Sequence, residues 1–161
     1  QASEEAIGFF GRGGSSETNR RRLSGAHQKM ADIHEAQGSI DAALVSHQQA
    51  LAVLRDAFGD DHDDSLEALV DIGNLLSRHE RRIEGLSYYA EWLEILRRSK
   101  GNASPEVAHA LRSLWNIEIS LNFEDPEGGH LEKATAYFEE LKAIQAELDA
   151  IDTEAEEPVA P

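Results

Sequence analysis

The stretch Met30–Leu51, MADIHEAQGSIDAALVSHQQAL, decides the fold, because its pattern returns in Asp71–Leu93, DIGNLLSRHERRIEGLSYYAEWL. Three pairs of small residues share a spacing of 42 residues: Ala31 and Gly73, Ala43 and Gly85, and Gly59 and Gly101. A repeat of this length is typical of proteins built from stacked units, in which no unit buries its apolar face alone. The sequence therefore predicts a repeat protein.

Apolar residues recur at helical spacing along the chain, and glycine, serine and proline separate the helical segments. No segment alternates with a period of two over a useful length, so no sheet is expected. The predicted helices are one that ends before Gly38, one from Ser39 to Phe58, one after Asp64, one over about Arg82–Lys100, one opened by Ser104 and Pro105, and a last one that includes Leu131 and Ile151. These segments predict an all-α fold of antiparallel helix hairpins.

Composition limits the classes of partner and of chemistry. The chain has 161 residues, enough for one domain, with 31 acidic and 15 basic side chains and a formal charge of −16. Such a field repels nucleic acid and anionic lipid, and no apolar run is long enough for membrane insertion. The absence of cysteine excludes disulfides and thiolate metal sites. Because the chain begins with Gln1, a processed or truncated product is expected, and its localisation stays open.

The acidic segment Gly59–Asp64, GDDHDD, has two interpretations. As a linker, Gly59 allows the left-handed turn after one helix, and Asp63 or Asp64 caps the next. A calcium loop would instead need oxygen ligands at alternate positions around a later glycine, and the spacing here differs. We expect the linker.

These residues resemble tetratricopeptide repeats, specifically the 42-residue repeats of kinesin light chains. That family places small residues where the two helices of a repeat cross, and Ala31, Ala43 and Ala50 match in the first repeat. In the second repeat Gly73 and Gly85 match, whereas Trp92 departs from the pattern. The resemblance implies a right-handed solenoid of about three repeats over roughly residues 23–148.

The third repeat is irregular. Trp115 replaces a small residue, and seven extra residues enter near Asn122–His130. We expect a wider last hairpin with Trp115 in the core. The predicted organisation is an N-terminal extension over residues 1–16, a repeat domain over 17–152 and an acidic disordered tail over 153–161.

The resemblance also implies a concave groove lined by the first helix of each repeat. The groove residues would be Gln28, Lys29, Asp32, Glu35, Asn74, Arg78, Arg112 and Asn116. Some relatives grip a chaperone's C-terminal carboxylate with a clamp of Lys, Asn and Arg. At the clamp positions this chain has Gln28, Asp32, Asp71, His109 and Ser113, which argues against the acidic tails of Hsp70 and Hsp90.

No catalytic constellation is visible. The chain has no glycine-rich phosphate loop, no His-Glu-x-x-His and no cysteine nucleophile, so no enzyme activity, cofactor or metal is expected. His27, His34 and His47 occupy repeat positions that are usually bulky, and we interpret them as core or boundary residues.

Two functions remain, and both involve unidentified protein partners. The first is a structural or assembly subunit of a larger complex, with end-on contacts through Phe9, Phe10, Tyr137 and Phe138. The second is a peptide-binding adaptor that uses the groove. The irregular third repeat and the apolar cluster at Phe9 and Phe10 favour the first.

Overall fold

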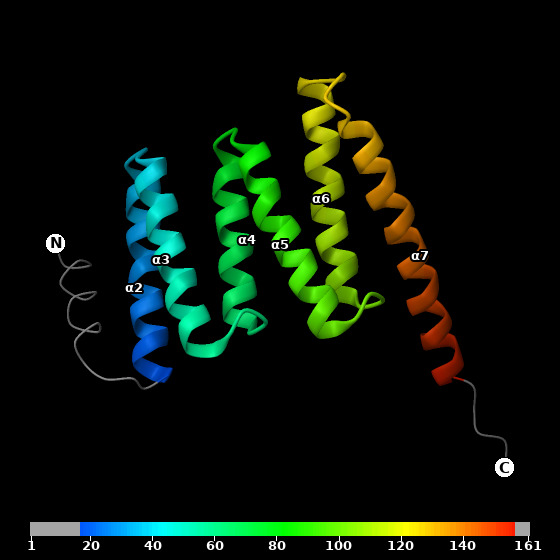
Figure 1. Ribbon diagram of the computed structural model, residues 1–161, viewed down its shortest axis with the longest axis horizontal. Coiled ribbons are helices and arrows are strands. Elements are labelled where there is room, and N and C mark those ends of the chain that lie inside the picture. Colours follow the sequence, from blue (N-terminus) through cyan, green and yellow to red (C-terminus); the bar gives the residue numbers. More distant parts are fainter. Residues whose placement is uncertain (1–16, 157–161) are drawn as a thin grey trace, which may run out of the picture. The chain divides into compact units, whose positions relative to one another are not determined.

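The computed structural model describes residues 17–156, and within them every regular element is a helix (Figure 1). The helices are α2 (Glu17–Ala36), α3 (Ile40–Phe58), α4 (Asp63–Arg78), α5 (Arg82–Lys100), α6 (Pro105–Glu124) and α7 (His130–Glu156). The prediction of an all-α fold is confirmed. None of the helices in this part of the chain is both long and apolar enough to cross a membrane. Helix α7 runs to Glu156 and so extends into the segment expected to form the tail.

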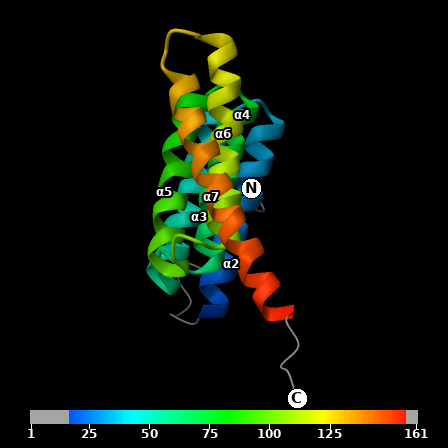
Figure 2. The same ribbon diagram turned by 90° about the vertical axis from the view of Figure 1, so that its right-hand side faces the viewer.

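The chain divides into two compact units, with the boundary inside α5 between Tyr88 and Tyr89. In the first unit, α2 packs against α3 and α3 against α4. In the second unit, α6 packs against α7, and Figure 2 shows these two helices side by side below the loop that joins them.

Small residues lie at the helix crossings of the first unit, as the repeat predicts. Ala31, Ala43 and Ala50 are completely buried. A Cβ atom added to Gly85 would lie 3.1 Å from the carbonyl oxygen of Gly73, so α4 and α5 approach closely at this pair. Larger side chains there would force the helices apart.

Glycines with positive φ end three of the helices. Gly38 has a φ of 74°, and Gly59 and Gly101 have φ values of 98° and 86°. After α2, the Gly38 N–H donates to the Glu35 carbonyl at 2.9 Å, and the Ser39 N–H donates to the His34 carbonyl at 2.8 Å. This pair of bonds satisfies carbonyl groups that the end of the helix leaves free.

The segment Gly59–Asp64 joins α3 to α4, but its cap differs from the predicted one. His62, and not Asp63 or Asp64, is the N-cap of α4, and its Nδ1 accepts from the Asp64 N–H at 3.1 Å. Asp63 and Asp64 lie in the first turn, where carboxylates are stabilised by the positive end of the helix. At the other capping sites, Ser104 Oγ accepts from the Val107 N–H, whereas the Ser39 side chain makes no capping bond.

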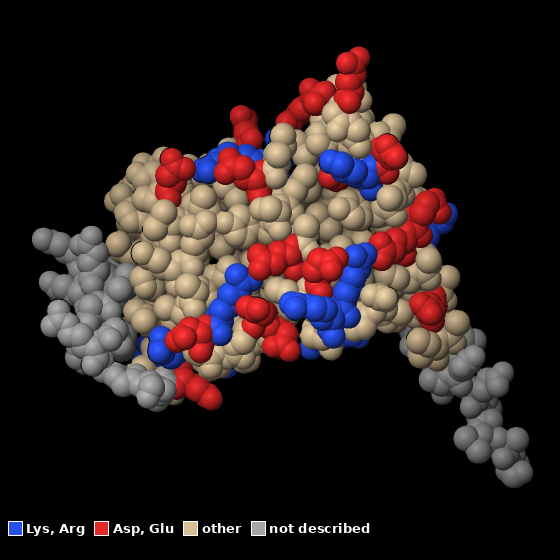
Figure 3. Space-filling model, in the orientation of Figure 1, with Lys and Arg blue, Asp and Glu red and all other residues tan. Residues whose placement is uncertain are grey.

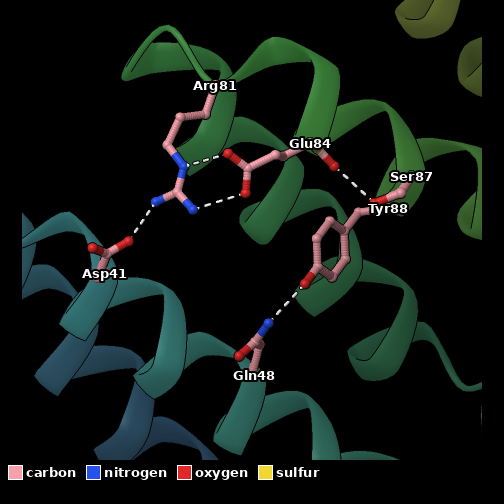
Figure 4. Close-up of polar contacts among 6 residues, drawn as sticks. All are labelled: Asp41, Gln48, Arg81, Glu84, Ser87 and Tyr88. Carbon is pink, nitrogen blue, oxygen red and sulfur yellow. Dashed lines mark hydrogen bonds and ion pairs between the residues drawn. The ribbon is translucent and has the colours of Figure 1, made fainter.

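A polar network joins α3 to the start of α5 in the first unit (Figure 4). Arg81 donates to Asp41 on α3 at 2.7 Å and to both carboxylate oxygens of Glu84 at 2.8 Å. The Gln48 amide donates to the Tyr88 hydroxyl at 2.8 Å. The hydrogen bonds from Arg81 to Glu84 and Asp41 hold its pKa above the ordinary value. These contacts are exposed, so they orient α3 and α5 more than they stabilise the fold.

The core of the second unit contains large aromatic side chains and one buried polar pair. Trp92 is buried, and its ring meets the ring of His109 edge-on at 5.4 Å. Trp115 is only half-buried, which places it less deeply in the core than expected. His130, the first residue of α7, contacts Glu118 of α6 through Nδ1 and Oε2 at 2.6 Å, and both side chains are buried. This contact closes the hairpin across the extra residues.

Candidate functional site

A polar pocket of about 280 Å³ lies in the first unit and is lined by side chains from three helices. Its residues are Gln28 and Asp32 of α2, His47 of α3, and Asp71 and Arg78 of α4. Because residues four or seven positions apart share one face of a helix, α2 and α4 each direct two of their side chains to the pocket. His47 completes the site from the neighbouring helix.

His47 is the most buried member of the pocket, with 6% of its surface exposed. Burial lowers the pKa of His47, and the negative charges of Asp71, Asp32 and Glu35 oppose this effect only in part. No hydrogen bond joins the His47 ring to another described residue. The imidazole is therefore held neutral at physiological pH, with its polar atoms available to a ligand.

The two aspartates of the pocket differ in their surroundings. Asp71 is half-buried, and desolvation raises its pKa; the nearby charge of Asp32 raises it further, while His47 and Arg78 act in the opposite direction. Asp32 is exposed at the rim. Two like charges that face one pocket repel each other, and a bound cation would relieve this repulsion.

Arg78 offsets these aspartates only in part, because Glu35 binds its guanidinium. Arg78 Nε and Nη2 donate to the Glu35 carboxylate at 3.0–3.1 Å, and His79 Nε2 lies 2.9 Å from Glu35 Oε1. Burial would raise the pKa of Glu35, but the bonds from His79 and Arg78 outweigh it and lower that pKa. The pocket thus keeps a negative balance from Asp32 and Asp71.

The structure brings together some of the predicted groove residues. Gln28, Asp32 and Arg78 line the pocket, and Glu35 binds Arg78 beside it. Lys29 and Asn74 are exposed on α2 and α4 but do not line the pocket. Arg112 and Asn116 are exposed on α6, in the second unit. Their role in binding stays a prediction.

His47 is the pocket residue that sequence reasoning assigned to another role. The interpretation of His47 as a core or boundary residue describes its burial but missed its place in the pocket. Ala43 and Ala50 stand four residues before and three residues after His47, so all three share one face of α3, and all three are buried.

The residues predicted for an end-on interface lie partly outside the described chain. Phe9 and Phe10 precede residue 17, where the description begins. On α7, Phe138 is 38% exposed; its ring stacks at 5.4 Å on Trp115, and Lys142 Nζ lies 5.6 Å from its centre. Tyr137 is half-buried, and this burial raises its pKa. Phe138 is thus partly covered by its own unit.

Charge over the surface is mixed in sign. On the face in Figure 3, acidic and basic side chains lie next to one another at several places. Ion pairs account for part of this pattern, for example Arg20 with Asp56 at 3.0 Å and Arg97 with Glu140 at 2.6 Å. In residues 17–156, no group of three or more His, Asp or Glu side chains is arranged to hold a metal ion.

Comparisons with known proteins agree with this fold. The family model Tetratricopeptide repeat matches residues 22–82. A crystal structure of BtubC (BKLC) from P. vanneervenii is similar, with a TM-score of 0.64 and 19% sequence identity. The similarity covers 90% of this chain and 54% of that one, so the chain spans about half the length of that protein. At this identity the likeness shows the fold alone.

No curated protein matches the chain in sequence. The matched segment, residues 22–82, contains α3 and α4 and every residue that lines the pocket. Over this segment the chain is similar to tetratricopeptide repeats, and the helical fold of the described residues agrees with that similarity.

Proposed function

We propose that the chain is a non-enzymatic adaptor that binds a segment of a partner protein in the pocket of its first unit. Tetratricopeptide repeats are protein–protein interaction modules, and helical repeats bind through surfaces that neighbouring helices share. The observation that supports the proposal is the pocket itself, which three helices of the repeat segment line with polar side chains.

The chemistry of the pocket suits a side chain of a bound peptide. Asp32 is exposed at the rim of the pocket and His47 is buried at its inner end, so a side chain could enter past Asp32 and reach His47. Small sites of this kind give specificity through a few polar groups, while contacts around them provide the rest of the affinity. The proposal therefore places one anchoring side chain of the partner in the pocket.

A second candidate function is the structural or assembly subunit favoured by the sequence. The observation that supports it is the apolar exposure of α7, where Leu131, Phe138 and Ile151 are 55%, 38% and 57% exposed. Leu131 and Phe138 lie seven residues apart and so share one face of α7, and exposed apolar side chains on one face can mark an interface with another protein. We place this function second, because the pocket of the first unit offers a more defined site.

Peptide selection from a displayed random library would test the adaptor. Gln28→Trp fills the pocket with a large side chain, and Lys29→Trp places the same side chain next to it but outside the pocket. We expect the wild type and Lys29→Trp to enrich the same peptides and Gln28→Trp to lose them. Enrichment of the same peptides by all three proteins, or no enrichment by the wild type, would contradict the proposal.

The assembly function makes a different prediction for the same proteins. If α7 forms the interface, Phe138→Ser would abolish capture of a large complex while Gln28→Trp retains it. Binding assays with both variants thus separate the two functions, because each variant disturbs only one of the two surfaces.

A further inference from the structure

We propose that the pocket binds the primary ammonium group of a lysine side chain. This inference rests on the proposed function, since it names the chemical group of the partner segment that enters the pocket. It concerns the site lined by Gln28, Asp32, His47, Asp71 and Arg78.

The charges around the pocket favour a cation. Asp32 and Asp71 each bring a carboxylate, while the one guanidinium is held by both oxygens of Glu35. The whole chain also has a formal charge of −16, which attracts cationic segments. An anionic ligand would have to displace Glu35 from Arg78 and remain near two aspartates.

The buried imidazole of His47 is the independent observation that points to a ligand. More than nine-tenths of His47 is buried, it lines the pocket, and it makes no hydrogen bond with another described residue. A neutral imidazole has one nitrogen that accepts a hydrogen bond, and the His47 nitrogens are not among the fully buried atoms of the described chain that lack a partner, so the accepting nitrogen is reachable from the pocket. A donor from a ligand would satisfy it.

The geometry of the acceptors fits an ammonium better than the other common cations. The acceptors come from three helices and so approach from different directions, whereas the planar fork of an arginine requires acceptors in one plane. An ammonium donates three hydrogen bonds in a compact arrangement. Asp32, His47 and Asp71 do not form a metal-binding group in the described chain.

Binding should depend on pH through the same residues. His47 faces Asp32 and Glu35 of α2 and Asp71 and Arg78 of α4, and burial lowers its pKa. Asp71, whose pKa is raised by burial, takes up a proton at higher pH than an ordinary aspartate. Acidification thus adds a positive charge at His47 and removes a negative one at Asp71. Both changes weaken the binding of a cation.

The test uses the whole chain and two small probes. Nα-acetyl-lysine methylamide and Nα-acetyl-norleucine methylamide differ only in the ammonium group, and NMR would follow the ring signals of His47, assigned with His47→Gln. We expect the lysine probe to shift these signals at pH 7.5 and the norleucine probe to leave them unchanged. Asp71→Asn and Asp32→Asn should each weaken binding about fivefold.

Asp56→Asn is the matched control, because it removes the same charge from an exposed aspartate of α3 that does not line the pocket. Equal shifts with both probes, no shift at His47, or equal weakening by all three variants would overturn the inference. The outcome is separable from that of the proposed function. If the lysine probe binds while no library peptide is enriched, the lysine site is supported and the adaptor function is contradicted. If library peptides that contain no lysine are enriched, the adaptor function is supported and the lysine site is contradicted.

Discussion

Glu80 is held in a backbone conformation that suits glycine. Its φ is 61°, and it lies 42 residues after Gly38, the glycine that ends α2 with a φ of 74°. The Arg81 N–H donates to the Leu76 carbonyl at 2.9 Å, as the Ser39 N–H does to the His34 carbonyl one repeat earlier. The two turns are therefore equivalent, but only the second has a side chain in the left-handed region.

Glu80→Gly should raise the free energy of unfolding by about 1 kcal/mol, because it removes the steric cost of a left-handed side chain. Urea denaturation followed by circular dichroism would measure the change. Glu80→Gln is the control, since it removes the charge and keeps the strain, and it should have little effect. Equal stabilisation by both variants would show that charge, and not backbone conformation, is responsible.

His27 and His47 should make stability depend on pH. Burial lowers the pKa of both histidines below the value of 6.5 expected in the unfolded chain. The unfolded state therefore binds protons more readily than the folded state. Each neutral histidine contributes to the free energy of unfolding above pH 6.5, and this contribution is lost as the pH falls toward the pKa of that histidine in the folded state. The raised pKa of Asp71 has the opposite effect on the pH dependence of stability, but it is raised from an ordinary value of 3.8, which lies below the range in which the histidines act.

We expect the free energy of unfolding to fall between pH 7.5 and pH 5.5, as measured by urea denaturation at both values. In His27→Gln/His47→Gln the decrease should be smaller, because neither replacement takes up a proton. The same decrease in this double variant would assign the pH dependence to other groups.

Two helix glycines of the first unit have opposite surroundings. Gly85 faces the Gly73 carbonyl oxygen at 3.1 Å and Ser77 Oγ at 3.3 Å, measured from an added Cβ, whereas Gly25 of α2 has nothing within 4 Å. The helix crossing therefore needs a small residue at Gly85 and does not need one at Gly25.

Gly85→Leu should lower the free energy of unfolding by about 1–3 kcal/mol, because the side chain separates α4 from α5. Gly25→Ala should raise it by up to about 1 kcal/mol, because alanine favours the helix. Thermal denaturation of both variants beside the wild type measures the two signs. A stable Gly85→Leu protein would mean that the crossing adapts without cost.

The repeat pattern predicted the helices and their crossings because both depend on the identity of local residues. Ala31, Ala43 and Gly85 lie where the spacing of 42 residues requires close contact. The cap at His62 was not predicted, because aspartate is the more frequent cap and stands next to it in the sequence. The contact of Glu118 with His130 depends on the path of the loop between them.

The candidate site could be predicted only in part, because it also depends on how the helices pack and not on local residues alone. The resemblance to a known repeat placed Gln28, Asp32 and Arg78 on the binding side, and these residues line the pocket. The choice between core and pocket for His47 depends on how α2, α3 and α4 pack in three dimensions. The pairing of Arg78 with Glu35, which limits how far Arg78 offsets the aspartates, depends on rotamers that periodicity does not specify.

At the scale of the whole molecule, excess negative charge should act on folding and on binding in opposite ways. With 31 acidic and 15 basic side chains, like charges repel one another in the folded chain, and salt screens this repulsion. Raising NaCl from about 20 to 300 mM should therefore raise Tm by a few degrees, corresponding to about 1 kcal/mol. The same salt should weaken the binding of a lysine peptide, because it screens attraction.

Differential scanning calorimetry at pH 7.5 and near pH 4.7, the isoelectric point of the sequence, would test the origin of the salt effect. Near pH 4.7 the net charge vanishes, so added NaCl should no longer raise Tm. If NaCl lowers Tm at pH 7.5, attraction in surface pairs such as Arg20 with Asp56 outweighs the net repulsion. The excess negative charge would then be compensated by nearby basic side chains. In that case the chain would not attract cationic partners at long range, and only the carboxylates of the pocket would select lysine.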